Sequence, residues 1–382
     1  MRTVTRISAV TALVAGLCSA VVPQALSADA AGSNPVVVVS GLNNPRQIVL
    51  VGNDELLIAE AGKGGKIKTT GPDGEATFIG ATGSISVVYL PQFARHTHPT
   101  RVVHGLMSGA GADGSAAVGS DGVAARTPHG RIFIQETFAP PGVLPPSLQR
   151  QNGRLLVAPR PYRSVHAIAN IARYEKVHDP DHKGFDSDPY AVIARKSDLL
   201  IADAAGNDVL RRDAKGHLHV FHVFPNVKTG SCAKQADPSP KFPGCNFVPT
   251  SLATDSAGHV YVGGLSSLTP RQAQVVKLSA DGKHVLRVYH GFSGVSGIAV
   301  SPKGVVYVSE LFGTEKHAPN PQVQGVVTRI SPSGHRSHRD VPFPAGLAVS
   351  STGTLYVVAF SIAPEGGLGV PGSSGQVWRM NW

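Results

Sequence analysis

Acidic side chains recur at one position of a repeated sequence pattern, and they are the residues best suited to chemistry. Each ends a short apolar run: Glu60 ends LLIAE, Glu136 ends IFIQE, Asp203 ends LLIAD and Glu310 ends VYVSE. Equivalent positions of repeats arranged around an axis emerge at the same end, so these carboxylates would lie near a central channel. With Asn207 as a neutral ligand, they could hold Ca²⁺ for a metal-dependent hydrolase or lyase.

The competing interpretation of these acids is structural. Each carboxylate would accept hydrogen bonds from backbone N–H groups at the end of its own repeat. Two of the six repeats lack an acid at this position, and Gly264 occupies it in one of them. The sequence therefore favours the structural interpretation over the metal site, and Ca²⁺ stays a possible cofactor.

A second acidic cluster lies in the segment HDPDHKGFDSD. Its aspartates surround Gly184 and are Asp179, Asp181, Asp186 and Asp188. The D-x-D spacing followed by glycine is typical of part of a calcium loop, but the twelve-residue pattern with its terminal Glu is missing. We therefore expect a polar connecting loop with a turn at Gly184.

Histidines form two groups, one of His178 and His182 and one of His217, His219 and His222. Alternation along a strand would place His217 and His219 on the same face. Two imidazoles supply only half of a zinc site, so we expect surface histidines in both groups.

The elements that must position these residues follow from a pattern that occurs six times. An apolar run, a turn rich in Gly, Asp or Ser, and a second apolar run make up each copy. The copies are NPRQIVLVGNDELLIAE, GSDGVAARTPHGRIFIQE, DPYAVIARKSDLLIAD, PTSLATDSAGHVYVGG, VSGIAVSPKGVVYVSE and PAGLAVSSTGTLYVVA. One small sheet cannot bury both of its faces, so several must pack in a ring, which predicts an all-β, six-bladed β-propeller.

The two ends of the sequence predict how the ring closes. The chain stops after GQVWRMNW, a third strand without a fourth, whereas Val36 to Ser40 is a fourth-type strand with no blade before it. Pairing Val36–Ser40 with Gln376–Met380 would complete one blade and remove two unpaired edges. No linker or low-complexity tract divides the chain, so residues 31–382 are predicted to form one domain.

The N-terminus has the features of an export signal. Arg2 and Arg6 precede an apolar stretch from Ile7 to Val22, and small residues precede a cleavage position after Ala30. The apolar stretch is shorter than the roughly 20 residues that a spanning helix needs. We therefore expect residues 1–30 to be a signal peptide, and the mature protein to be secreted, extracellular and without a transmembrane segment.

Signal removal leaves Cys232 and Cys245 as the thiols of the mature chain. In an exported protein, two lone cysteines thirteen positions apart most simply form a disulfide, with a loop-closure contribution of about 3 kcal/mol. A catalytic or metal-binding thiol pair is the alternative, but neither a C-x-x-C nor a paired histidine motif accompanies them.

The net charge of +10 favours anionic partners, such as cell-wall polymers or lipid headgroups. The basic residues are scattered without aromatic interleaving, which argues against nucleic-acid binding. The chain also lacks the G-x-S-x-G, H-E-x-x-H and phosphate-loop motifs.

Three further segments are expected to lie outside the repeated strands. Residues 107–119 and 139–151 are rich in Gly, Ala or Pro, and we expect them to be loops over one face. Residues 164–176 place apolar side chains at helical spacing, which predicts a short amphipathic helix packed on the second blade.

Several ordered motifs together resemble the ScyD/ScyE family of secreted proteins, which are related to NHL-type propellers. The motifs are NNPR at Asn43, DSDPYAVIA at Asp186, LIADAAGNDVLRRDAKG at Leu200, VPTSLATDSAGHVYVGGL at Val248 and PAGLAVSSTGTLYVVAF at Pro344. The resemblance spans nearly all of the mature chain and implies a six-bladed propeller outside the cytoplasm. It implies no catalytic residues.

Together, these patterns predict a secreted, monomeric propeller that acts as a non-catalytic binding or scaffolding module. Its ligand would be a small molecule, a glycan or a protein, with a preference for anions. The alternative is a Ca²⁺-dependent hydrolase or lyase with its site in the central channel.

Overall fold

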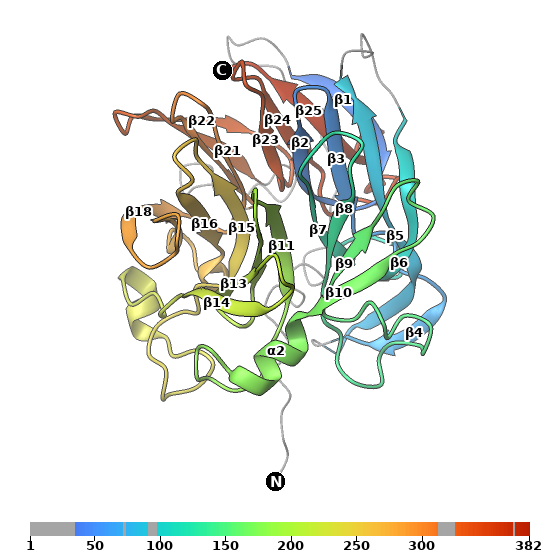
Figure 1. Cartoon of the computed structure of the whole chain (residues 1–382), viewed down its shortest axis with the longest axis horizontal. Coiled ribbons are helices and arrows are strands. Elements are labelled where there is room, and N and C mark those ends of the chain that lie inside the picture. Colours follow the sequence, from blue (N-terminus) through green and yellow to red (C-terminus); the bar gives the residue numbers. More distant parts are fainter. Residues whose placement is uncertain (1–34, 72–73, 91–97, 312–324, 370) are drawn as a thin grey trace.

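The protein is a β-propeller, in which antiparallel sheets surround a common axis (Figure 1). The structure, a computed structural model, describes residues 35–71, 74–90, 98–311, 325–369 and 371–382. The expected signal peptide, residues 1–30, lies outside the described residues. No helix in the described part of the chain is long and apolar enough to cross a membrane.

Four of the sheets contain four strands each, and their strands are named in spatial order. The first is β1 (Val36–Leu42), β25 (Gly375–Met380), β24 (Leu355–Ala359) and β23 (Leu347–Val349). The second is β11 (Pro189–Ala194), β12 (Leu199–Asp203), β13 (Asp208–Arg212) and β14 (Leu218–Val223). The third is β15 (Pro249–Thr254), β16 (Val260–Gly264), β17 (Ala273–Leu278) and β18 (Val285–Phe292). The fourth is β19 (Val295–Val300), β20 (Val306–Glu310), β21 (Val326–Ile330) and β22 (Arg336–Asp340).

The first two sequence repeats belong to a single sheet of nine strands. Its strands are β2 (Pro45–Val51), β3 (Glu55–Glu60), β4 (Ile67–Thr70), β5 (Ala76–Tyr89), β6 (Thr100–Ala110), β7 (Val118–Ala125), β8 (Ile132–Glu136), β9 (Arg154–Ala158) and β10 (His166–Asn170). Strands β6 and β7 join its two halves through the pairs Ser108–Gly119 and Gly109–Val118. A count of six blades requires dividing the sheet at this short contact, so the number of blades stays a prediction.

The repeated pattern forms the inner hairpin of each unit. In the third sheet, for example, β15 and β16 are joined by a turn in which Gly258 N donates to Asp255 O. Gly258 adopts a φ of +81°, a left-handed conformation that glycine reaches without steric cost. The turn residues in the repeat therefore mark real hairpin turns.

Ring closure follows the predicted pairing. Strand β1 runs antiparallel to β25, with Val36 opposite Arg379 and Ser40 opposite Gln376. The two ends of the described chain thus share one sheet, drawn in blue and red in Figure 1. The prediction that the N-terminal strand completes the C-terminal blade is confirmed.

Apolar side chains fill the space between neighbouring sheets. One cluster joins Val39 of β1 and Val358 of β24 to Leu56 of β3, and all three side chains are fully buried. The other face of the same sheet packs through Val357 against Tyr307 of β20, so this sheet buries both faces, as a small sheet must to be stable.

Two expectations about connecting segments were right only in part. The short helix predicted over residues 164–176 is present as α2 (Ile171–His178), but residues 166–170 form strand β10 instead, because β10 pairs with β9 and the Asn170 side chain caps the helix at Arg173 N. The segments 107–119 and 139–151 are not simple surface loops. Met107, Leu144 and Leu148 are buried together against Ile79, so these segments add a small core of their own.

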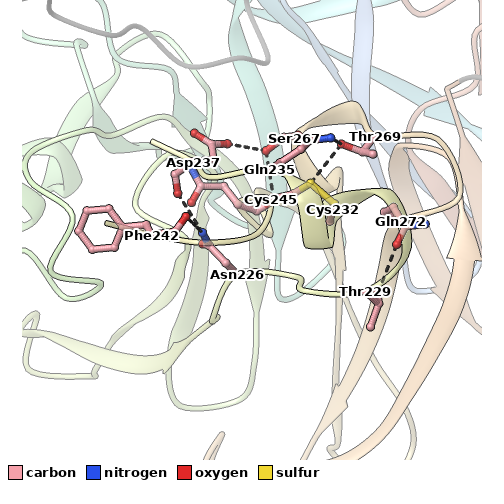
Figure 2. The surroundings of a disulfide bond; sticks show 11 residues. Asn226, Thr229, Cys232, Gln235, Asp237, Phe242, Cys245, Ser267, Thr269 and Gln272 are labelled. Atoms are coloured by element: carbon pink, nitrogen blue, oxygen red, sulfur yellow. Dashed lines mark hydrogen bonds between the residues drawn. A yellow bond between two sulfur atoms is a disulfide. The ribbon is translucent and has the colours of Figure 1, made fainter. Parts of the chain in front are cut away.

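The predicted disulfide is confirmed. Cys232 and Cys245 are bonded and fully buried, beside two short 3₁₀ helices, η2 (Gly230–Lys234) and η3 (Ser266–Leu268) (Figure 2). Asn226 Nδ2 donates to Asp237 O and Phe242 O within the loop, and Ser267 Oγ donates to Asp237 Oδ2. The disulfide and the Asn226 hydrogen bonds tie the 226–246 segment to itself, and the Ser267 hydrogen bond attaches it to η3, which connects β16 and β17 of the third sheet.

Candidate functional site

The innermost strands of the propeller enclose a central channel. Strands β2, β7, β11, β15, β19 and β23 all contribute to one cavity of about 230 Å³. Most of its lining side chains are apolar, for example Leu50, Val192 and Ile298. None of the described residues that line it is an acid, a histidine or a basic residue. We call this cavity the funnel.

Several polar groups of the funnel lie near the N-terminal ends of its strands. They include Gln47, Tyr190, Thr250 and Ser251. Thr250 Oγ1 donates to Val295 O at 2.7 Å, whereas Ser251 Oγ is buried and has no hydrogen-bond partner among the described residues. Burial raises the pKa of Tyr190 above its usual range, so its phenol stays a neutral donor. The polar groups at this end of the funnel are therefore uncharged.

Arg46 lies beyond the funnel, where it lines a second cavity of about 50 Å³. Its guanidinium donates to the carbonyl oxygens of Ala117 and Ser361, and its Nε lies 3.3 Å from Asp121 Oδ1. Arg46 and Asp121 are both buried. The arginine thereby links β2 to the segments just before β7 and just after β24, in the neighbouring units of the ring.

The four strand-end acids all lie at the same end of their blades as Arg46 does. Each is opposite the first residues of its inner strand: Pro45 faces Glu60, Ser120 faces Glu136, Pro189 faces Asp203 and Val295 faces Glu310. None of the four, nor Asn207, is among the described residues that line the funnel. All four carboxylates are buried.

Glu60 is held by an arginine and by its own blade. Arg101 Nη2 lies 2.8 Å from Glu60 Oε2, and Asn43 N donates to the same oxygen at 2.7 Å. Ser86 Oγ donates to Glu60 Oε1. Both oxygens of this carboxylate therefore have partners.

Asp203 and Glu310 accept equivalent hydrogen bonds. Asp203 Oδ1 accepts from Asp188 N, and Glu310 Oε2 accepts from Ser293 N, so each acid binds the backbone just before its inner strand. A hydroxyl group binds the other oxygen, from Ser187 and Thr328 respectively. Burial raises the pKa of Asp203 to about 7 and also raises the pKa of Glu310.

Glu136 is the strand-end acid with one carboxylate oxygen that lacks a hydrogen bond among the described residues. Ser120 Oγ donates to its Oε1 at 2.6 Å, whereas Oε2 has no hydrogen-bond partner among the described residues. Burial raises its pKa well above the usual range, and the neighbouring Asp121 raises it further. Burial likewise raises the pKa of Asp121 to about 7 and that of Asp188 to about 6.

Asn207 does not contact the strand-end acids through the hydrogen bonds of its side chain. Its amide connects two other segments. Its Nδ2 donates to Asp181 Oδ2 at 3.0 Å, and its Oδ1 accepts from Val248 N at 3.1 Å. In the described residues, the acidic and histidine groups close enough to share an ion are Asp213 with His217 and His219, and Glu175 with Asp179 and Asp181. A metal site shared by Glu60, Glu136, Asp203, Asn207 and Glu310 stays a prediction.

The histidine groups lie at different places. His217 and His219 are exposed and approach Asp213 Oδ2 at 3.6 and 3.0 Å. His222 instead contacts Gly282 O at 2.8 Å, and His178 stacks on Tyr174 with ring centroids 4.1 Å apart. The sequence signal for the Asp213 contact was present, because this aspartate precedes the two histidines in the same β-hairpin.

Sequence reasoning missed several buried ionisable residues, namely Arg46, Asp121, Glu175 and Asp208. Asp188 was expected in a polar loop, but it is buried and accepts a hydrogen bond from Thr137 Oγ1. No local motif marks these residues, because the ring brings them to their partners from different strands.

Comparisons with known proteins support the fold. No family model matches the chain, and no curated protein matches it. The chain is similar to a Thermus thermophilus protein described as a putative oxidoreductase (glucose dehydrogenase), with 14% identity, coverage of 91% of this chain and 99% of that chain, and a TM-score of 0.50. It is also similar to a Bacteroides thetaiotaomicron protein of unknown function, with 11% identity, coverage of 91% and 76%, and a TM-score of 0.51.

A third solved structure is the WD40 β-propeller domain of Doa1, with 11% identity, coverage of 91% of this chain and 97% of that chain, and a TM-score of 0.47. At such identities the likeness concerns the fold, because one propeller architecture carries many unrelated activities.

Proposed function

We propose that the protein is a secreted binding module whose ligand enters the funnel. The observation that carries this proposal is the chemistry of the funnel lining, which is mostly apolar and bears neutral hydrogen-bonding groups near the N-terminal ends of its strands. Ligand sites are typically concave, mostly apolar surfaces with a few well-placed polar groups. The strand-end acids, with most of their oxygens bonded within their own blades, serve the scaffold in this proposal.

The funnel chemistry favours a neutral small molecule with an apolar body. The hydroxyl of Ser251 is buried against Gly263 of β16, so the apolar lining, and not this group, carries the preference. No basic side chain is among the described lining residues, so the positive net charge of the protein would not select anions here. Anionic partners would instead bind to the surface of the protein outside the funnel.

Export and family membership are parts of the same proposal. The buried disulfide is compatible with an oxidising compartment outside the cytoplasm. The propeller fold agrees with the resemblance to ScyD/ScyE proteins, which we propose as the family of this chain.

A matched pair of probes tests the binding proposal. We expect 1-naphthol, a neutral aromatic alcohol, to bind with a change in its fluorescence, and naphthalene-1-sulfonate to bind more weakly. Ala253→Trp fills the funnel and should abolish naphthol binding, whereas the control Val285→Trp, on the exposed strand β18, should retain it. Equal binding by both tryptophan variants would refute the funnel as the site.

The alternative proposal is a metal-dependent hydrolase or lyase that uses the strand-end acids. The open Oε2 of Glu136, beside Asp121, is the observation that favours it. Such an enzyme should hydrolyse or cleave members of a lactone and ester panel in the presence of Ca²⁺. EDTA and Glu136→Gln should each abolish that activity, and an inactive wild-type protein loaded with Ca²⁺ would count against this alternative.

A further inference from the structure

A cluster of carboxylates lies where α2 meets the connection between β12 and β13 in the second sheet. Glu175 projects from α2, Asp179 caps the C-terminus of that helix, and Asp181 follows in the next turn. Asp203 ends β12 and Asp208 begins β13. These five residues come from α2, the loop that follows it, β12 and β13, and we call them the α2 acidic cluster.

The carboxylates of this cluster converge closely. One oxygen each from Glu175, Asp179 and Asp181 lies within 4.8 Å of the others. Gly206 leaves room for them, since a Cβ at this glycine would lie 3.2 Å from both Glu175 Oε2 and Asp203 Cγ. Asp208 lies directly opposite Asp203 in the pairing of β12 with β13, and burial, followed by Asp203, Glu175 and Asp181, raises its pKa.

Acidic side chains far outnumber basic side chains at the cluster. Among the described residues, the cluster has one ion pair, in which Lys183 Nζ lies 3.2 Å from Asp181 Oδ2. Lys183 Nζ also donates to Asn226 Oδ1 and Asn246 Oδ1, each at 2.7 Å, so its three protons are already committed. One ammonium therefore faces five carboxylates.

Two of the carboxylates are buried without hydrogen bonds. Glu175 is 1% exposed and Asp208 is 0% exposed, yet all four of their side-chain oxygens lack a hydrogen-bond partner among the described residues. Neither charge state satisfies them: an ionised carboxylate would be a bare buried charge, and a protonated one would be a donor without an acceptor. Burial, followed by the neighbouring acids, raises the pKa of Glu175 to about 9.

We propose that the α2 acidic cluster binds a calcium ion through Glu175, Asp179, Asp181 and Asp208. Ca²⁺ takes six to eight oxygen ligands, including carboxylates from irregular loops, and it would satisfy the open oxygens and offset the excess charge together. Asn207 is a positioning residue, because its Nδ2 holds Asp181 Oδ2 at 3.0 Å. Backbone N–H groups of Lys183 and Gly184 orient Asp179, and Lys183 N also binds Asp181. Asp203, bound by Ser187 and by the backbone, lies outside the converging group of oxygens.

The chemistry of the ligands distinguishes calcium from other ions. Zinc prefers nitrogen and sulfur donors, whereas the converging atoms of this cluster are carboxylate oxygens. Mg²⁺ demands a near-ideal octahedron and keeps several waters, which suits a buried cluster of carboxylates less well than Ca²⁺ does.

Bound calcium would lock three parts of the fold together. The ligands come from α2, from the loop that follows it and from β13, while Lys183 connects the same loop to the disulfide segment through Asn226 and Asn246. The inference does not depend on the funnel or on any catalytic activity.

Calorimetry and thermal unfolding of the whole mature protein test the site. After treatment with EDTA and its removal, we expect titration with CaCl₂ to show one ion per chain and to raise the melting temperature by several degrees. MgCl₂ and ZnCl₂ should have smaller effects. No binding heat and no thermal shift at millimolar CaCl₂ would overturn the proposal, as would a stronger response to ZnCl₂.

Matched variants assign the binding to these residues. Glu175→Gln/Asp208→Asn should weaken Ca²⁺ binding at least about tenfold, whereas Asp213→Asn, in the exposed histidine group, should leave it unchanged. In EDTA the double variant should melt no lower than the wild type, because it removes two acids that lack hydrogen-bond partners among the described residues. Retained binding by a folded double variant, or loss of binding in Glu136→Gln alone, would overturn the assignment.

A second variant approaches the same site without removing a ligand. Gly206→Ala would place a methyl group 3.2 Å from Glu175 Oε2, and the backbone of Gly206 is not left-handed, so the chain can accept alanine. We expect weaker Ca²⁺ binding with unchanged far-ultraviolet circular dichroism. Unaltered binding by this variant would contradict the placement of Glu175 at the ion.

Discussion

Gln47 of β2 makes two hydrogen bonds to the backbone of Val192 in β11. Its Nε2 donates to Val192 O at 2.9 Å, and its Oε1 accepts from Val192 N at 3.1 Å. The same Oε1 also accepts from Val123 N, in β7, at 3.2 Å. One side chain thus connects three inner strands, β2, β7 and β11. Among the described residues, these strands do not pair with one another in a sheet.

Replacing Gln47 should destabilise the ring. Gln47→Leu keeps the approximate volume but leaves buried backbone groups of Val192 and Val123 without partners, which costs about 1–3 kcal/mol. Urea unfolding of the variant measures this loss. The control Gln149→Ala removes one hydrogen bond from an exposed glutamine and should change the free energy of unfolding by less than about 0.5 kcal/mol. Equal losses in both variants would contradict a special role for Gln47.

The Glu60–Arg101 pair predicts that a variant without the arginine is less stable than a variant without both partners. Arg101→Met leaves a fully buried carboxylate without its cation, and the loss of one partner of a buried pair costs about 3–5 kcal/mol. Glu60→Gln/Arg101→Met removes the charge as well and should recover part of the stability. Denaturant unfolding of both variants and the wild type gives the comparison, and a double variant less stable than Arg101→Met would exclude this explanation.

Buried Asp188 predicts a dependence of stability on pH. Burial raises its pKa from 3.8 to about 6, so the folded state holds the proton more tightly than the unfolded state. The resulting stability is complete below pH 4 and is lost as the pH rises to about 6, a change of about 3 kcal/mol. The free energy of unfolding in EDTA should therefore fall less steeply between pH 4.5 and 7 in Asp188→Asn than in the wild type. Parallel pH profiles would disprove this dependence.

The disulfide should contribute measurably to stability. Cys232→Ala/Cys245→Ala opens the loop and should cost about 3 kcal/mol, the chain-entropy value for a loop of this length. Dithiothreitol should lower the melting temperature of the wild type toward that of the double variant. The double variant should not respond to the reductant, and a wild type that does not respond under denaturing conditions would argue against the contribution.

The sequence predicted those features that depend on local patterns. Alternating apolar residues and turn glycines such as Gly258 located the hairpins, and the unpaired strand types at the two ends predicted the contact between Val36 and Arg379. Spacing and compartment predicted the disulfide. Each of these features needs only a neighbouring segment or the register of one repeat.

The candidate sites were less accessible from sequence because they depend on tertiary convergence. Glu175 appeared as one polar residue of a helix, and Asp208 as the first residue of a third strand. Their open oxygens become significant only when α2 is placed against β12 and β13. Arg46 was likewise one residue of the NNPR motif, and its partners Ala117 and Ser361 belong to other units of the ring.

The pairing of β1 with β25 also determines how the ring would respond to force. Val36 and Arg379 lie opposite each other, so tension applied at residues 36 and 380 acts across the same end of the ladder. The hydrogen bonds of this pair would then break one after another, as in a zipper, instead of sharing the load in shear. Mechanical opening should begin at this seam at low force, while the remaining sheets stay intact.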